Sequence, residues 1–293
     1  DYSQKETVVR PQMEVNVQIL DWLRFKADAN MNYYYTKFEE KQLGSGYANE
    51  GGKYTMGQTT KEQATFGGTF TVNKQIQDFS VGGFARYEYY TSRSEAYKVY
   101  TDGGMVVPGQ WFVDNSKNPK KSEASISNTK RMMSAVFALN LGWKNQVYLD
   151  VTGRNDWSST LPSETRSYFY PAVSGSIIMS QLLKMPEWLN FWKLRGAWTV
   201  TKSDLGIYDT NQAYSVSTNV WDGMNTAVYP EMIRSTTLEP TAARSYEIGT
   251  AFNVWDNRLR FDISYYNKLK YNLTREATIS GSSGFTKTLV NYD

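Results

Sequence analysis

The chain of 293 residues contains no cysteine and no histidine, and these absences exclude several kinds of site. Within this chain there is no disulfide framework, no thiolate or imidazole metal ligand, and no Ser-His or Cys-His nucleophile. Catalysis by paired carboxylates stays open. The net charge is only +3, from 32 basic and 29 acidic residues spread along the chain. This argues against a nucleic-acid partner, because phosphate binding requires a concentrated basic face.

Long apolar runs are also lacking. The longest is residues 135–139, whereas a membrane-spanning helix needs about 18 apolar residues, so a helical membrane protein is excluded. The first ten residues are charged and lack the apolar core of a signal peptide. We therefore expect either a trimmed precursor or a chain that begins inside a larger protein.

What the sequence does contain is apolar residues at every second position, the pattern of a strand with one apolar face. The run 23–35 would exceed about 40 Å at roughly 3.3 Å per residue, which is long for a globular strand. Similar runs predict about ten strands and no amphipathic helix. They are residues 13–19, 23–35, 66–72, 79–89, 133–143, 147–151, 173–179, 194–200, 246–254 and 259–265.

The predicted connections alternate in length. Short turns at 21–22, 73–78, 144–145 and 255–258, with a medium one at 181–192, alternate with long loops at 36–63, 91–130, 155–167 and 201–243. An up-and-down meander then has its short turns at one end and its long loops at the other. That is the layout of an antiparallel transmembrane β-barrel with periplasmic turns and extracellular loops.

The 44 aromatic residues agree with this layout. Trp22, Trp143 and Trp255 lie at short turns, and tyrosine clusters at 33–35, 87–90 and 168–170 lie where strands meet long loops. Two such belts are what bilayer headgroup regions favour, although Tyr and Trp also favour strands in general. A soluble sandwich or propeller is disfavoured by the long strands, the asymmetric loops and the lack of a repeat of roughly 40 to 50 residues.

Ten strands need not be a whole barrel. Residues 286–292 begin another strand-like run, and an open sheet edge is not viable in lipid because unpaired backbone groups are costly there. We therefore expect either that another part of the protein supplies further strands or that these residues are only a portion of the barrel.

Several ordered motifs resemble the SusC/RagA family of TonB-dependent outer-membrane transporters. DVTGRNDWSSTLP at 150–162 and YFYPAVSGS at 168–176 resemble a strand, loop and next strand of that family. LRGAW at 194–198, LEP at 238–240 with SYEIG at 245–249, NRL at 257–259, YY at 265–266, SGF at 283–285 and Asn291 continue in the same order. The match covers residues 131–293 well and the first 130 only by pattern. Thr241, where the family usually has Glu, and TKSD at 201–204 depart from it and leave the substrate class open.

The resemblance implies a barrel of about 22 strands around an N-terminal plug. Residues 1–293 would then be part of one barrel domain, without the plug and the closing strands. It also implies import of a large nutrient, an oligosaccharide or a peptide, with energy from TonB acting on a segment outside this sequence. A SusD-like surface lipoprotein would cap the barrel in the outer membrane of a Gram-negative bacterium, of the Bacteroidetes. No cofactor and no enzyme activity are implied.

If the apolar face meets lipid, the alternate face lines the lumen and touches a polar, oligomeric solute or the plug. The lumen candidates are Arg24, Lys26, Asp28, Arg86, Glu88, Asp150, Arg154, Glu247, Arg260 and Asp262. The alternative is that each only solvates the wall or pairs with a neighbour. Because a slip of one residue exchanges the two faces of a strand, this assignment depends on the register.

The predicted loops hold nine aromatic residues that could contact a solute or the lipoprotein, or could instead pack on one another. They are Tyr47, Tyr54, Tyr97, Tyr100, Trp111, Phe112, Tyr208, Tyr214 and Trp221, of which Tyr97, Trp111, Tyr208, Tyr214 and Trp221 are the contact candidates. For the cluster Arg154 to Trp157 we favour a structural clasp, in which the charges hydrogen-bond loop backbone, over substrate contact.

Two other functional classes compete with a transporter. One is an outer-membrane enzyme with a carboxylate-based active site among the loops, although no carboxylate pair stands out by spacing. The other is a passive adhesin or scaffold.

Overall fold

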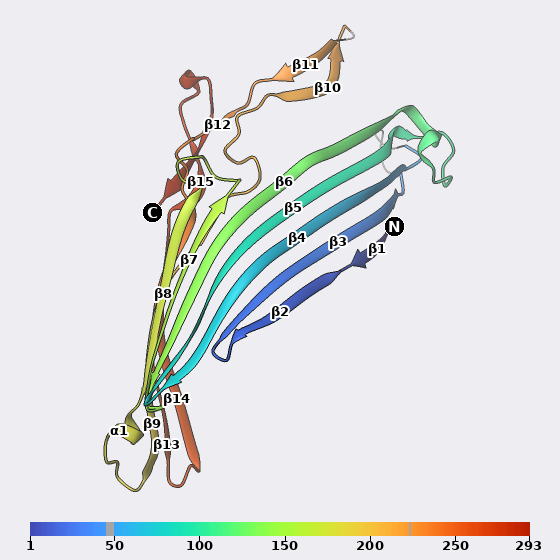
Figure 1. The fold of residues 1–293 in the computed structure, drawn as a ribbon. Coiled ribbons are helices and arrows are strands. Elements are labelled where there is room, and N and C mark those ends of the chain that lie inside the picture. The colour runs from blue at the N-terminus through green and yellow to red at the C-terminus, as the bar shows by residue number, and fades with distance from the viewer. Residues whose placement is uncertain (45–49, 223) are drawn as a thin grey trace. The chain divides into compact units, whose positions relative to one another are not determined.

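The protein is built almost entirely of strands in a computed structural model that describes residues 1–44, 50–222 and 224–293. Eleven strands form one large sheet: β1 Tyr2–Val9, β2 Gln12–Leu20, β3 Leu23–Gln42, β4 Lys53–Ile76, β5 Phe79–Met105, β6 Ser116–Trp143, β7 Val147–Ser158, β8 Ser167–Ile178, β9 Leu189–Ser203, β13 Thr241–Val254 and β14 Leu259–Tyr271. Their order is β1-β3-β4-β5-β6-β7-β8-β9-β13-β14, with β2 also on β3 (Figure 1). The predicted antiparallel meander is confirmed.

The remaining elements are short and belong to the connections. They are β10 Ser215–Trp221 with β11 Met224–Val228, a three-stranded sheet of β12 Met232–Arg234, β16 Lys287–Tyr292 and β15 Leu273–Thr278, the helix α1 Met179–Leu182, and the 3-10 turns Val113–Asn115 and Gly281–Ser283. No helix in the described ranges is long and apolar enough to cross a membrane.

The chain divides into two compact units. The first consists of Asp1–Val15, Asp28–Gly67 and Tyr89–Arg131, and the second of Asn16–Ala27, Gly68–Glu88 and Met132–Asp293. Each is described by itself below. That residues 1–293 belong to one barrel domain remains a prediction.

The long loops predicted at 36–63 and 91–130 are wrong in extent, because most of those residues lie in strands. β4, β5 and β6 have 24, 27 and 28 residues. At about 3.3 Å per residue β5 can reach about 90 Å, whereas the apolar band of an outer-membrane barrel is about 25 Å tall. A strand that has left the bilayer needs no apolar face, so the alternation fades while the backbone ladder continues.

The first strand, β1, is not visible in the sequence pattern. It pairs antiparallel with β3, from Tyr2 opposite Glu40 to Val9 opposite Tyr33. Between β1 and β2 the carbonyl oxygen of Pro11 still accepts a hydrogen bond from the N–H of Met31 at 3.0 Å. Proline has no N–H to return, and the strand is interrupted at this point.

The other predicted connections are placed as expected. Strands β2–β3, β4–β5, β6–β7 and β13–β14 are joined by short turns, and residues 204–240 form the longest connection outside the large sheet. The loop predicted at 155–167 is shorter than predicted, because β7 continues to Ser158 and β8 begins at Ser167. The strand expected at 286–292 exists as β16, but it pairs parallel with β12 and antiparallel with β15. A small buried cluster of Leu161, Tyr168, Leu205, Leu238 and Leu289 packs these connections together in the second unit.

Candidate functional site: the polar face of the second unit

The strand register of the second unit divides its residues between two faces. On β13, Gly249 lies opposite Arg195 of β9 and Ser264 of β14. Residues opposite one another point to the same side, and residues alternate sides along a strand. The candidates Glu247, Arg260 and Asp262 therefore share a face with Arg195, which we call the polar face.

The opposite face carries Ile248, Trp198 and Ile263, and it is apolar. Ile248 opposes Gly196 and Tyr265, and its side chain is 63% exposed, as is usual for a residue that meets lipid rather than a protein core. The alternation that was visible in the sequence thus corresponds to a real division of the sheet.

Strands β6 to β8 continue the polar face. Ser176 of β8 lies opposite both Tyr148 of β7 and Arg195 of β9, which ties the two halves of the face together. Asp150 and Arg154 are two and six residues along β7 from Tyr148, so both candidates lie on this face.

The beginning of the second unit follows the same rule. Phe25 packs on Phe70 with ring centroids 4.8 Å apart, and both lie in the apolar hollow that also contains Phe137. Arg24 and Lys26 flank Phe25 and hence point to the opposite side of β3. The Arg24 Nε donates to Gln18 Oε1 at 3.2 Å.

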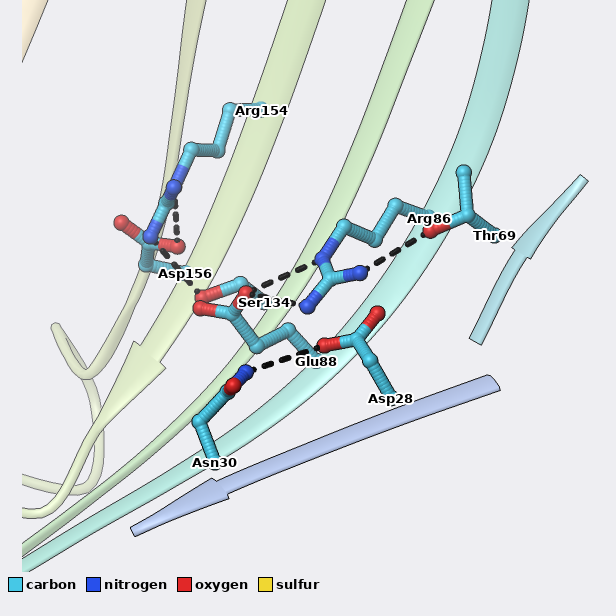
Figure 2. A network of polar contacts seen from close by, with 8 residues as sticks. All are labelled: Asp28, Asn30, Thr69, Arg86, Glu88, Ser134, Arg154 and Asp156. Atoms are coloured by element: carbon cyan, nitrogen blue, oxygen red, sulfur yellow. Dashed lines mark hydrogen bonds and ion pairs between the residues drawn. The ribbon is translucent and has the colours of Figure 1, made fainter. Parts of the chain in front are cut away.

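Arg86 and Glu88, which are two residues apart on β5 and therefore on the same side of the strand, form an ion pair (Figure 2). The Arg86 Nε donates to Glu88 Oε2 at 3.0 Å, and its Nη1 donates to Thr69 Oγ1 at 2.9 Å. Both side chains are only about one-fifth exposed. This agrees with the alternative that they stabilise the wall, and it leaves their role towards a solute as a prediction.

Arg154 is held by side chains and not by loop backbone, which corrects the detail of the expected clasp. Its Nε donates to Asp156 Oδ1 at 2.8 Å and its Nη2 to Ser134 Oγ at 3.1 Å (Figure 2). The Tyr170 hydroxyl donates to the other oxygen of Asp156 at 2.7 Å. Asp156 and Ser134 are buried. The clasp therefore joins β6, β7 and β8, consistent with a structural role.

The same strand end is fixed to a distant loop. Asp204, just after β9, accepts hydrogen bonds from Ser158 Oγ at 2.5 Å and Thr160 Oγ1 at 3.2 Å. Tyr168 is buried beside this network in the leucine cluster. The family-like motif at 150–162 thus ends in a network that anchors a connection.

Near the other end of the polar face, Arg195 is the centre of a second network. Its Nη2 donates to Asp262 Oδ1 at 2.7 Å and to Ser264 Oγ at 2.5 Å, and its Nε lies 3.8 Å from Glu247 Oε1. A Cβ on Gly249 would lie 2.6 Å from the Arg195 Nε, so a larger residue there would displace the guanidinium from its present position. Arg195 was not among the lumen candidates. The sequence could have indicated it, because Arg195 occupies a polar position that alternates with the apolar positions of Leu194 and Trp198.

Asp28 belongs to the first unit. It is buried, with the Asn30 Nδ2 3.5 Å from its Oδ2 (Figure 2). This separation is at the outer limit of a hydrogen bond.

The first unit also carries a charged cluster on β5 and β6. The Lys98 Nζ lies 2.9 Å from Glu123 Oε2, and the Tyr100 hydroxyl donates to Glu123 Oε1 at 3.0 Å. The hydrogen bond from Lys98, followed by the one from Tyr100, lowers the pKa of the Glu123 carboxyl below its ordinary value. Lys53 lies over the Tyr100 ring, 4.7 Å from its centroid.

The contact candidates among the aromatic residues do not gather in one place. Tyr97 lies within β5 and Trp221 at the end of β10, so neither is a loop residue as predicted. Tyr208 and Tyr214 lie in the connection before β10 and are exposed, and Tyr214 packs edge-on against Tyr229. Trp111 is half-buried.

Two of the other aromatic residues also differ from the loop prediction. Tyr54 and Tyr100 lie in strands, and Tyr54 is buried. Tyr47 lies outside the described residues. The prediction that some of these rings contact a solute or a partner therefore rests on Trp221 and the tyrosines of the β10 connection.

Acidic side chains are plentiful on both units. Within the described ranges, no group of three or more of them could hold a metal ion.

Comparison with known proteins identifies the fold. No protein-family model and no curated protein matches the chain. Among solved structures it is similar to the RagAB peptide transporter, with a TM-score of 0.82 and 17% identity over 99% of this chain and 33% of that chain. The closed-closed state of the RagAB peptide importer gives a TM-score of 0.80 at the same identity, over 99% of this chain and 33% of that chain.

A more distant similarity is to the siderophore receptor PiuA from Acinetobacter baumannii, with a TM-score of 0.54 and 12% identity over 98% of this chain and 42% of that chain. The chain spans about one third of the length of the RagAB chains that it matches. At this identity the comparison shows the fold. The chain therefore has the fold of part of the β-barrel of the RagAB structures, and this confirms the predicted antiparallel barrel fold.

Proposed function

We propose that this chain forms part of the wall of an outer-membrane active transporter that imports a large polar nutrient, a peptide or an oligosaccharide. One observation supports this above the others: nearly the whole chain superposes on the RagAB peptide transporter. The polar face, with charges of both signs from Arg24 to Asp262, suits a wall that borders a polar solute or a plug.

The partners follow from the same proposal. Energy comes from TonB through a segment outside this sequence, and a SusD-like surface lipoprotein covers the extracellular end. The exposed aromatic residues Tyr208, Tyr214 and Trp221 are the proposed contacts with the lipoprotein or the solute, because exposed rings supply large contact area at low entropic cost. We assign the protein to a bacterium of the Bacteroidetes on the family resemblance.

The proposal is tested by uptake. The gene is deleted and restored on a plasmid, and growth is measured on a peptide mixture or on single oligosaccharides as the only source of carbon or nitrogen. We expect loss of growth on one class of polymer, rescue by the plasmid, and the same loss in a strain without TonB. Unchanged growth on every polymer, with the protein shown to be present in the outer membrane, would refute the proposal.

The same strains separate the competing classes. An outer-membrane enzyme would release polymer fragments into the medium from purified protein, and an adhesin would leave uptake intact. Neither class is favoured by a particular constellation in the described residues.

A further inference from the structure

A pocket of about 460 Å³ with a mixed polar and apolar lining opens on the polar face of the second unit, near the short-turn ends of β4 to β7. Its polar lining side chains include those of Asn73, Gln75, Ser80, Asn140, Tyr148 and Asp150. Two glycines keep it open. A Cβ on Gly142 would lie 2.3 Å from the Ser80 Oγ, and one on Gly82 would lie 3.1 Å from the Asn73 Oδ1.

The carboxylate in this pocket forms no ion pair within the described residues. The Asp150 carboxylate accepts a hydrogen bond from the Asn140 Nδ2 at 2.6 Å and a weaker one from the Ser174 Oγ at 3.4 Å, and both donors are neutral. In the part of the chain that the structure describes, no cation pairs with it. Lys74 also lines the pocket, but its ammonium lies over the Trp22 ring, 5.5 Å from the centroid.

The other carboxylates of the polar face differ in this respect. Glu88, Asp156 and Asp262 each have an arginine partner. Asp150 lacks the arginine partner that these three carboxylates have, so its charge is available to a cationic group of another segment or molecule.

We propose that this pocket binds the ammonium or guanidinium group of a basic side chain on a polypeptide. The carboxylate supplies a charge-assisted hydrogen bond, which is about twice as strong as a neutral one. The amides of Asn73 and Asn140 each offer a donor and an acceptor, which matches the N–H and C=O groups of a peptide backbone. The Tyr148 ring offers apolar surface to the methylene stem of Lys or Arg.

Such a side chain has two possible sources. One is a segment of the same protein that enters the barrel, and the other is a peptide in transit. The second source rests on the proposed function, whereas the first does not. The test is made on the intact protein purified in detergent and measures binding and not uptake, so its failure and that of the proposed function are distinguishable.

The substitution Tyr148→p-benzoylphenylalanine introduces a photo-cross-linking side chain into the pocket. The protein is irradiated with and without added trilysine amide, and the adducts are identified by mass spectrometry. We expect an adduct with a Lys- or Arg-containing segment of the same protein, or with trilysine. Asp150→Asn should reduce its yield about tenfold, because a charged hydrogen bond is lost. Asp262→Asn is the matched control, since it removes a carboxylate of the same face outside the pocket, and should leave the yield unchanged.

An adduct with the protein's own segment identifies the first source, and an adduct with trilysine the second. The proposal is overturned if no adduct forms, if the adduct carries no basic residue, or if Asp150→Asn and Asp262→Asn have equal effects. Electrophoretic mobility of the unheated barrel verifies that each variant is folded.

Discussion

The Asp156 carboxylate is the best place to test whether the clasp of β6, β7 and β8 holds the wall together. It accepts hydrogen bonds from Arg154 Nε at 2.8 Å and from the Tyr170 hydroxyl at 2.7 Å, and its side chain is only 4% exposed. A hydrogen bond to a charged group contributes about 1.5 to 3 kcal/mol, so two of them would give about 3 to 6 kcal/mol. Arg154 is one-third exposed and regains water when its partner is lost. We therefore expect Asp156→Ala to lower the free energy of unfolding by about 2 to 4 kcal/mol.

The measurement is urea unfolding in detergent micelles, followed by the fluorescence of the nine tryptophans. Tyr170→Phe should cost about 1 to 2 kcal/mol, and its effect should largely vanish when Asp156→Ala is already present, because both changes remove the same bond. Asp262→Asn, whose side chain is 62% exposed and therefore screened by water, should have a much smaller effect. The reasoning is refuted if Asp156→Ala lies within about 0.5 kcal/mol of the original protein, or if the two carboxylate substitutions have equal effects.

Three further predictions concern packing, faces and pH. Gly83→Ala should destabilise the barrel by about 1 to 3 kcal/mol, because its Cβ would lie 2.3 Å from a backbone carbonyl oxygen of β6. Gly68→Ala should be close to neutral in the same urea assay, because the nearest atom to its Cβ would be 3.5 Å away. Val151→Lys on the apolar face should lower the free energy of unfolding by about 2 to 4 kcal/mol, and the neighbouring Thr152→Lys on the polar face should lower it much less. Equal decreases for the two substitutions would contradict the assignment of the faces. The pKa of Glu123 is lowered in the folded protein, so its contribution to stability is present above its ordinary pKa of 4.5 and is lost as the pH falls through the lower value. The difference in unfolding free energy between the original protein and Glu123→Gln should therefore be largest near neutral pH and disappear in acid. A difference that stays constant with pH would count against the ion pair.

Most of the sheet could be predicted from the sequence, and the reason is the bilayer. Where one face meets lipid, alternation is obligatory, so runs such as 133–143 and 246–254 identified β6 and β13. Above the bilayer that requirement ends. The outer parts of β4 to β6 and the whole of β1 need no apolar face for their backbone pairing, so their side chains show no alternation in polarity, and they were predicted as loops or not at all.

The candidate site was predictable to the level of its face. The register places Glu247, Arg260 and Asp262 on one side as the alternation required. The pairings are set by contacts between strands far apart in sequence: Arg195 meets Asp262 across 67 residues, and Arg154 meets Ser134 across 20. No local spacing reveals such partners. The partners of Arg195 and the pocket beside Asp150 were missed for this reason.

The 27-residue strand β5 has a consequence for how other molecules encounter the cell. In the proposed outer-membrane barrel, an apolar band about 25 Å tall accommodates about 9 to 11 residues of a tilted strand, so more than half of β5 would lie outside the bilayer. Its backbone N–H and C=O groups remain paired within a sheet and are not displayed as a flexible peptide. An antibody or a phage tail fibre that meets this region would bind a folded β-sheet surface, and an antiserum raised against short linear peptides from residues 91–105 should recognise intact cells poorly.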